Sequence, residues 1–187
     1  MSSTAKITLV LGGARSGKSR YAENLIAALP SPWQPPWTYV ATAEAGDAEM
    51  TERIGAHRAR RGAAWHTLEA PRDLAAALKS CTAPVLVDCL TLWLSNLLLA
   101  AADIDAEVAQ LEDALAALKA PIVLVTNEVG SGIVPDHPLG RRFRDLQGLV
   151  NQRMAARAPT KKRFIKLVLA LRCVPTAPLG CPVVPEV

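Results

Sequence analysis

The stretch GGARSGKS, residues 12–19, matches the pattern G-x-x-x-x-G-K-[ST] through Gly12, Gly17, Lys18 and Ser19. An apolar run, ITLVL, precedes it, and a helical pattern, RYAENLIAAL, follows it. In a glycine-rich loop that joins a strand to a helix, successive backbone N–H groups can face one anion, and the N-terminus of the helix adds partial positive charge. Lys18 would then reach the β- and γ-phosphates of a nucleotide, and the Ser19 hydroxyl would ligate Mg²⁺. A chance match in a Gly- and Ser-rich turn is the alternative, but the flanking strand and helix favour a nucleotide-binding P-loop.

Outward from this loop, apolar segments rich in Val, Ile and Leu alternate with helical patterns. This alternation predicts an α/β fold, P-loop NTPase-like, with a mostly parallel central sheet flanked by helices in a single domain over residues 1–157. The near-continuous hydrophobicity of the segments suits strands that are covered on both faces. We expect strands at 7–11, 37–42, 65–69, 84–88 and 121–126, and helices at about 17–29, 47–61, 71–80, 90–100, 105–119 and 138–157.

The charge of the chain is unevenly distributed. Of 187 residues, half are hydrophobic, which excludes general disorder, and the formal net charge is +4. Residues 158–187 hold five basic residues and one acidic residue, whereas residues 1–157 hold 16 of each. The basic excess therefore belongs to an atypical, proline-rich C-terminal tail, in which a last strand is expected at 164–171. Residues 1–157, which carry no net charge, are therefore poorly suited to bind nucleic acid. If the basic tail alone bound DNA or RNA, that binding would depend steeply on salt.

Targeting signals and cysteine pairs are not evident. MSSTAK leads directly into a five-residue apolar run, too short for a secretory signal, and the longest apolar run, LWLSNLLLAAA, is too short to span a bilayer. The four cysteines, Cys81, Cys89, Cys173 and Cys181, form no CxxC pair and fit no zinc or disulfide framework. We expect a cytoplasmic protein with no membrane span.

Several polar residues stand where expected strands end. Asp88 closes PVLVD, and because ligands gather at the carboxyl ends of parallel strands it is a candidate for the Mg²⁺ shell. The alternative is that Asp88 caps the helix that begins near Leu90. Thr42 and Thr126 end other strands and are expected at the same edge. Glu69 ends WHTLE, where a ribose or base contact and a plain surface carboxylate are both open.

One histidine lies among arginines in ERIGAHRARRG, residues 52–62. Just before and within this stretch, Glu49, Arg53, His57 and Arg61 are spaced four apart, so on a helix they share one face. Nearby guanidinium groups disfavour a protonated imidazole and hold phosphate, which suits a nucleophile that accepts a nucleotidyl group. The alternative is a solvated amphipathic helix with an incidental histidine. We interpret His66 as a structural strand residue and His137 as a loop residue.

Four segments taken in order resemble one known family. They read LVLGGARSGKSRYAE, YVATAEAGDAEMTERIGAHRARRGAAWHTLEAP, VLVDCLTLWLSNLL and VLVTNEVGSGIVPDHPLGRRFRDLQGLVNQRMA, and together they cover roughly residues 6–157. A P-loop alone marks only a superfamily, whereas its combination with RIxxHRxxR and TNEVGxGIVP is far more specific. The chain is similar to the bifunctional adenosylcobinamide kinase / adenosylcobinamide-phosphate guanylyltransferase of cobalamin biosynthesis.

This resemblance implies two transfers by one homotrimeric enzyme. It would phosphorylate adenosylcobinamide with ATP or GTP, and then transfer GMP from GTP to the new phosphate through a guanylyl-histidine. His57 would be the nucleophile, Lys18 a second catalytic residue, and Ser19 and Asp88 the ligands of Mg²⁺. The nucleotide site that the resemblance implies comprises Gly12, Gly13, Ala14, Arg15, Ser16, Gly17, Lys18, Ser19, Ala41, Thr42, Ala43, Arg58, Ala59, Arg60, Arg61, Glu69 and Asp88.

The chain departs from the family pattern at two places. Some relatives have two adjacent histidines where this chain has Ala56 and His57, and the tail after residue 157 does not follow the family. A P-loop nucleotide-binding protein or switch, or a kinase without guanylyl transfer, is therefore the competing interpretation. Such a protein would bind nucleotide and form no covalent adduct.

Overall fold

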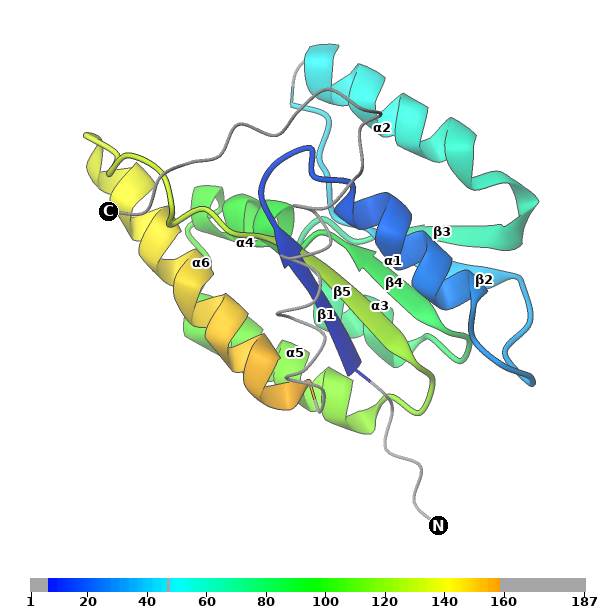
Figure 1. Ribbon diagram of the computed structural model, residues 1–187. Helices are drawn as coiled ribbons and strands as arrows, with labels where there is room; N and C mark the ends of the chain where they lie inside the picture. Colours follow the sequence, from blue (N-terminus) through cyan, green and yellow to red (C-terminus); the bar gives the residue numbers. More distant parts are fainter. Residues whose placement is uncertain (1–6, 47, 159–187) are drawn as a thin grey trace, which may run out of the picture.

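The computed structural model describes residues 7–46 and 48–158 (Figure 1). Within them, five strands form one parallel sheet in the order β1-β5-β4-β2-β3. The strand bounds are β1 Ile7–Gly12, β2 Trp37–Ala41, β3 Trp65–Glu69, β4 Val85–Asp88 and β5 Ile122–Asn127. The expected parallel α/β sheet is confirmed, with each strand within one residue of its predicted bounds.

Helices connect the strands as expected. Their bounds are α1 Lys18–Ala27, α2 Ala48–Arg61, α3 Leu74–Lys79, α4 Leu90–Leu99, α5 Ile104–Ala117 and α6 Pro138–Arg157, with a 3₁₀ turn, η1, at Gly62–Ala64. The prediction of a helix from residue 71 was wrong, because α3 begins at Leu74. The carbonyls of Pro71 and Arg72 instead accept hydrogen bonds from the side chains of Asn96 and Trp93, at 3.0 and 2.8 Å, which holds this segment outside the helix.

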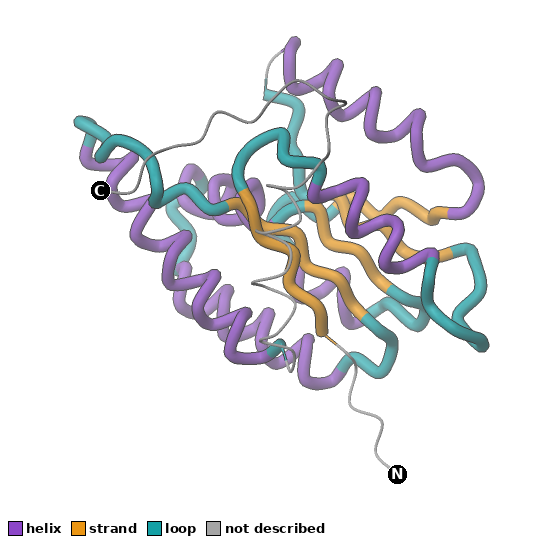
Figure 2. Tube along the Cα trace, in the orientation of Figure 1, coloured by secondary structure: helices purple, strands orange, loops and turns teal. Residues whose placement is uncertain are grey.

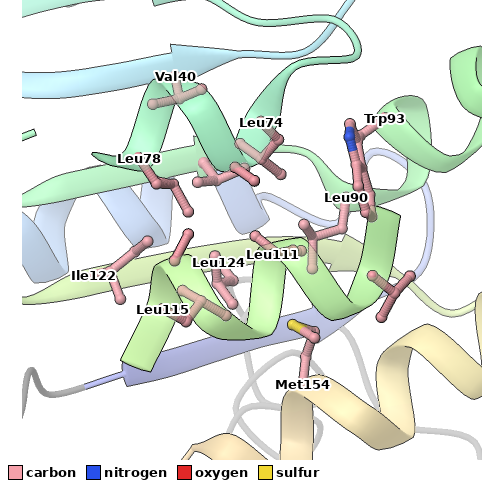
Figure 3. Close-up of a cluster of buried hydrophobic side chains, with 14 of the residues drawn as sticks. Val40, Leu74, Leu78, Leu90, Trp93, Leu111, Leu115, Ile122, Leu124 and Met154 are labelled. Carbon is pink, nitrogen blue, oxygen red and sulfur yellow. The ribbon is translucent and has the colours of Figure 1, made fainter. Parts of the chain in front are cut away.

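The helices cover the two faces of the sheet unequally (Figure 2). Helices α3, α4, α5 and α6 pack on one face, where Leu78, Trp93, Leu111 and Met154 belong to the larger buried cluster (Figure 3). Helix α1 packs on the other face through Ala22 and Ile26. Burying these apolar side chains on both faces is the main source of stability, and it leaves the edge formed by the strand ends for polar groups.

The carboxyl ends of the parallel strands lie at one edge of the sheet. In register, Ala41 of β2 stands opposite both Glu69 of β3 and Asp88 of β4, and Gly12 of β1 stands opposite Asn127 of β5. The P-loop begins at this edge, and Figure 1 shows α2 extending past it, away from the layered body. The strand order therefore brings the P-loop, Glu69 and Asp88 to the same side of the molecule.

The predictions for the C-terminal tail lie outside the described residues, including the strand expected at 164–171. The division into a domain of residues 1–157 and a tail of 158–187 stays a prediction. Among the residues that the structure describes, no helix combines the length and the apolar composition that a membrane span requires.

Candidate functional site

The loop between β1 and α1 turns through left-handed backbone. Gly17 has φ +85° and immediately precedes the first residue of α1, and Arg15 has φ +54°. A residue with a side chain pays about 1–2 kcal/mol for this conformation, whereas glycine adopts it freely. Gly17 thus lets the chain pass from the strand directly into the helix, whose first backbone N–H groups have no partner within the helix and suit an anion.

Lys18 folds back over the same loop. Its Nζ donates a hydrogen bond to the carbonyl of Gly13 at 2.5 Å and lies 3.4 Å from Ser16 Oγ. Although it is a lysine, its side chain is buried. A methyl group on Gly12 would lie 3.1 Å from Ser16 Oγ, so the loop is closely packed around this ammonium. The Lys18 ammonium therefore lies inside the turn of the loop.

A cavity of about 560 Å³ lies beside this loop, between α2 and the carboxyl ends of β2, β3 and β4. Its lining combines apolar side chains with charged groups of both signs, which is usual for a site that binds a small molecule. The apolar residues include Met50, Ile54 and Leu92. The polar residues are Ser19, Tyr39, Glu44, Thr51, His57, Arg58, Arg61, Thr67, Glu69, Asp88 and Cys89.

His57 faces Asp88 across this cavity. Its Nδ1 lies 3.9 Å from Asp88 Oδ2, and the two side chains are 27% and 12% exposed. The same carboxylate oxygen accepts a hydrogen bond from the Tyr39 hydroxyl at 2.5 Å. Asp88 does not cap α4, because the residue at that helix's N-cap is Cys89 and no side chain bonds there. The capping interpretation of Asp88 was therefore wrong.

Arg61 attaches the end of α2 to the sheet. Its Nε donates to the His57 carbonyl at 3.0 Å, one NH group donates to Thr67 Oγ1 at 3.1 Å, and its guanidinium lies 3.8 Å from the centre of the Tyr39 ring. The side chain is only 8% exposed. A buried guanidinium keeps its charge and needs such partners. Arg61 therefore fixes the backbone that carries His57.

Arg58 and Glu69 form a second link between α2 and the sheet. An Arg58 NH group donates to Glu69 Oε1, with side chains that are 61% and 65% exposed. Water screens an ion pair at this exposure. Both groups line the cavity, so either is available to a ligand at little energetic cost to the fold.

Two threonines that were expected to face the site are used by the fold instead. Thr42 is fully buried; its hydroxyl donates to the Cys89 carbonyl at 2.7 Å and accepts from the Cys89 N–H at 2.8 Å. Thr126 is also fully buried, and its hydroxyl bonds to Asn151 and Gln147 of α6 at 2.7 and 3.0 Å. The strand ends were correctly identified, but these two hydroxyl groups do not line the cavity.

The remaining predicted residues divide by whether they line the cavity. Those that line it come from separate parts of the chain and are Ser19, Ala41, Ala43, His57, Arg58, Arg61, Glu69 and Asp88. Residues 12–18 belong to the P-loop and Ala59 is exposed on α2, and none of these lines the cavity. The predictions for the side chains of Arg53 and Arg60 lie outside the described residues. His66 is exposed on β3. His137 lies in the loop before α6, as predicted, and its Nδ1 also accepts a hydrogen bond from the Leu139 N–H at 3.2 Å and so caps that helix.

Sequence reasoning missed Tyr39, Thr67 and the apolar residues of the cavity. Tyr39 lies inside WTYVAT, a run that predicts a buried strand, and nothing in that run indicates that a hydroxyl reaches Asp88. Thr67 likewise lies within a strand. The spacing of Met50 and Ile54, four apart on α2, was a local signal for the apolar part of the cavity lining.

The residues at the cavity fit a magnesium–nucleotide complex. Ser19 offers a hydroxyl and Asp88 a carboxylate, both oxygen ligands of the kind that Mg²⁺ prefers alongside phosphates and water. No cluster of three or more His, Cys, Asp or Glu side chains occurs in the part of the chain that the structure describes.

Comparisons with known proteins point to one family. A model of the family described as cobinamide kinase / cobinamide phosphate guanyltransferase matches residues 8–165. The chain is 50% identical to the bifunctional adenosylcobalamin biosynthesis protein CobP of Pseudomonas aeruginosa, over 80% of this chain and 87% of that protein. It is 43% identical to the bifunctional adenosylcobalamin biosynthesis protein CobU of Salmonella typhimurium, over 80% and 90%.

Among solved structures, a KaiC-like protein from Pyrococcus horikoshii aligns with a TM-score of 0.43 at 12% identity, over 76% of this chain and 67% of that chain.

The family match covers most of the chain, and it includes both the P-loop and the segment around His57. The chain therefore belongs to the cobinamide kinase / cobinamide phosphate guanyltransferase family, which confirms the bifunctional kinase and guanylyltransferase expected from its motifs.

Proposed function

We propose that this enzyme carries out guanylyl transfer in the cavity beneath α2, with His57 as the nucleophile and the P-loop as the holder of the triphosphate. The observation that carries the proposal is the common cavity: Ser19 at the end of the P-loop and His57 on α2 both line it, 38 positions apart in the sequence. A nucleotide held by the loop would thus lie within reach of the imidazole.

The chemistry proceeds in two displacements. A ring nitrogen of His57 attacks the α-phosphorus of GTP, the bond from that phosphorus to the oxygen bridging to the β-phosphate breaks, and pyrophosphate leaves with the electron pair. An oxygen of adenosylcobinamide phosphate then attacks the phosphorus of the bound GMP. The phosphorus–nitrogen bond breaks, its electron pair returns to the imidazole, and adenosylcobinamide-GDP is formed.

Cations around the cavity support both displacements. Lys18 neutralises charge on the phosphates at the loop, and Arg58 and Arg61 stand next to His57, where charge on the transferring phosphoryl group increases. Ser19 and Asp88 would hold Mg²⁺, which when bound offsets the charge of the triphosphate. Kinase and guanylyl transfer both use a nucleoside triphosphate, so both depend on Lys18.

The nucleotide site of this proposal comprises residues 12–19, 41–43 and 58–61 with Glu69 and Asp88. Thr42 belongs to this set by the family resemblance alone, because its hydroxyl bonds Cys89, its N–H donates to the Asp88 carbonyl and its carbonyl accepts from Asn96. Cobinamide and its phosphate are the substrates that the family implies. A homotrimer, which the family resemblance implies, and the cytoplasmic location expected from the sequence belong to the same proposal.

The test is the intact mass of the protein after incubation with GTP and Mg²⁺. Wild type gains one GMP group, which acid removes as expected for a phosphoramidate, and His57→Ala gains none. His57→Ala loses much less of its ATP-dependent phosphorylation of adenosylcobinamide, whereas Lys18→Ala loses both activities. A folded wild type that binds GTP and forms no adduct would overturn the role of His57 and leave a kinase or a binding protein.

A further inference from the structure

We infer that Tyr39 is a positioning residue for guanylyl transfer, because its hydroxyl holds Asp88 in the place where the carboxylate orients the His57 imidazole. The inference rests on the proposed role of His57 and adds to it a residue that does not touch the reacting atoms. Three independent contacts of Tyr39 support it: one to Asp88, one to Arg61 and one to Trp65.

The first contact joins Tyr39 to His57 through one oxygen. Asp88 Oδ2 accepts the Tyr39 hydroxyl at 2.5 Å and lies 3.9 Å from His57 Nδ1. The distance between Asp88 Oδ2 and His57 Nδ1 is too long for a hydrogen bond, and a movement of about 1 Å would bring the two atoms within hydrogen-bond range. Since the same oxygen faces both groups, the hydroxyl sets the direction in which the carboxylate points toward the imidazole.

The ring of Tyr39 is itself held firmly. Tyr39 is 2% exposed in β2, a strand paired on both sides, and the edge-to-face contact with Trp65 has ring centres 5.8 Å apart at 87°. The Arg61 guanidinium covers the ring at 3.8 Å and also donates to the His57 carbonyl. Tyr39 is thus linked to His57 twice, through Asp88 to the imidazole and through Arg61 to the backbone.

The Tyr39 hydroxyl acts as the donor in this arrangement. A carboxylate oxygen can only accept, so the 2.5 Å contact is a hydrogen bond from the Tyr39 hydroxyl to Asp88 Oδ2. Such a bond to a carboxylate is charge-assisted and short, which limits rotation of the acceptor.

The carboxylate in turn defines the chemistry of the imidazole. With Asp88 facing Nδ1, the proton stays on Nδ1 and the electron pair of Nε2 forms the bond to the α-phosphorus of GTP. As pyrophosphate leaves, the imidazole ring becomes cationic and the Asp88 charge stabilises it. When the phosphorus–nitrogen bond breaks in the second displacement, the electron pair returns to Nε2 and the ring is neutral again.

The experiment compares Tyr39→Phe with wild type in a single turnover with saturating GTP and Mg²⁺. This variant keeps the ring that contacts Arg61 and Trp65 and removes only the hydroxyl. We expect the rate constant of GMP-adduct formation to fall about 10- to 100-fold, the range found when a group that orients a metal-ligating histidine is removed. The GTP concentration for half-maximal rate should change less than about twofold, since Tyr39 acts on orientation and not on binding.

The second tyrosine of the chain provides a matched control. Tyr21 lies on α1 with 41% exposure and does not line the cavity. Tyr21→Phe should therefore form the adduct at the wild-type rate. Equal slowing in both tyrosine variants would show that the effect is not specific to the contact with Asp88 and would overturn the inference.

A double-mutant cycle tests whether Tyr39 acts through Asp88. In an Asp88→Ala background, which has no acceptor for the Tyr39 hydroxyl, the added Tyr39→Phe change should have little further effect on adduct formation. If the rate losses of the two single variants multiply in the double variant, the inference is overturned. If Tyr39→Phe fails to fold, the ¹⁵N shifts of His57 in the wild-type protein decide: the Nδ1-protonated tautomer supports the arrangement and the Nε2-protonated tautomer overturns it.

Failure of the inference and failure of the proposed function give different results. A wild-type protein that forms no adduct contradicts the role of His57 itself. A wild-type protein that forms the adduct, with Tyr39→Phe equally fast, leaves His57 as the nucleophile and removes only the positioning role of Tyr39.

Discussion

Replacing Arg61 with methionine should release α2 from the sheet. Among the α2 side chains that the structure describes, Arg61 is the one that is buried, so the helix lacks the apolar stripe that usually anchors a surface helix. Methionine keeps a similar stem and removes the bonds to the His57 carbonyl and Thr67 and the contact with the Tyr39 ring.

The cost follows from these three contacts. Hydrogen bonds from a charged donor contribute about 1.5–3 kcal/mol each, a desolvated cation–π contact adds about 2 kcal/mol, and the terms are not additive. We take about 2–4 kcal/mol as the loss of free energy that holds α2 on the sheet when all three contacts are removed. Since every 1.4 kcal/mol is a factor of ten, the population of molecules with α2 detached should rise roughly 30- to 700-fold. Arg58→Met is the matched control, since its partner Glu69 is 65% exposed and the pair contributes about 0–1 kcal/mol.

The assay is hydrogen–deuterium exchange of the α2 amides, which measures local opening directly. Exchange of residues 48–61 should accelerate strongly in Arg61→Met and less than about fivefold in Arg58→Met, while the amides of β4 and β5 keep their protection in both. Equal acceleration in the two variants, or no acceleration in Arg61→Met, would refute the reasoning that one buried guanidinium holds this helix.

Three further perturbations test other parts of the molecule. Gly17→Ala, at φ +85°, should lower the free energy of unfolding by about 1–2 kcal/mol in thermal melts, whereas Gly13→Ala, with open space around it, should change it little. Burial raises the pKa of Cys89 to about 11, so peptide mass spectrometry should find it alkylated at pH 8 only after denaturation; rapid labelling of the native protein would contradict this. The hydrogen bond from Arg153 lowers the pKa of Glu112, so this group stabilises the fold above its unfolded pKa, and the contribution is lost as pH falls through the folded pKa. Glu112→Gln should therefore cost about 1 kcal/mol in urea denaturation at pH 7 and progressively less as the pH falls below the unfolded pKa of the carboxyl; a cost that does not change with pH would rule out the charge as its origin.

Local sequence patterns determined the strands, the P-loop and the placement of His57 on a helix. A strand buried on both faces must be apolar along its whole length, and a P-loop needs glycine and lysine at fixed spacing, so both leave a signature within a few adjacent residues. Asp88 was found by the same means, because a polar residue that ends a buried strand is visible in the sequence alone. The segment around Pro71 and Arg72 was misread because the side chains that hold it come from α4.

The tertiary structure decided which of these residues meet. The order β1-β5-β4-β2-β3 puts β4 beside β2, and so brings Asp88 to the Tyr39 hydroxyl from 49 positions away. It also buries the Thr42 hydroxyl against Cys89, although Thr42 follows its strand in the same way as a site residue would. Strand neighbours in a parallel sheet are set by long crossover connections and by packing of helices on both faces. No local pattern encodes that choice, and for this reason the partners of His57 emerge only from the folded chain.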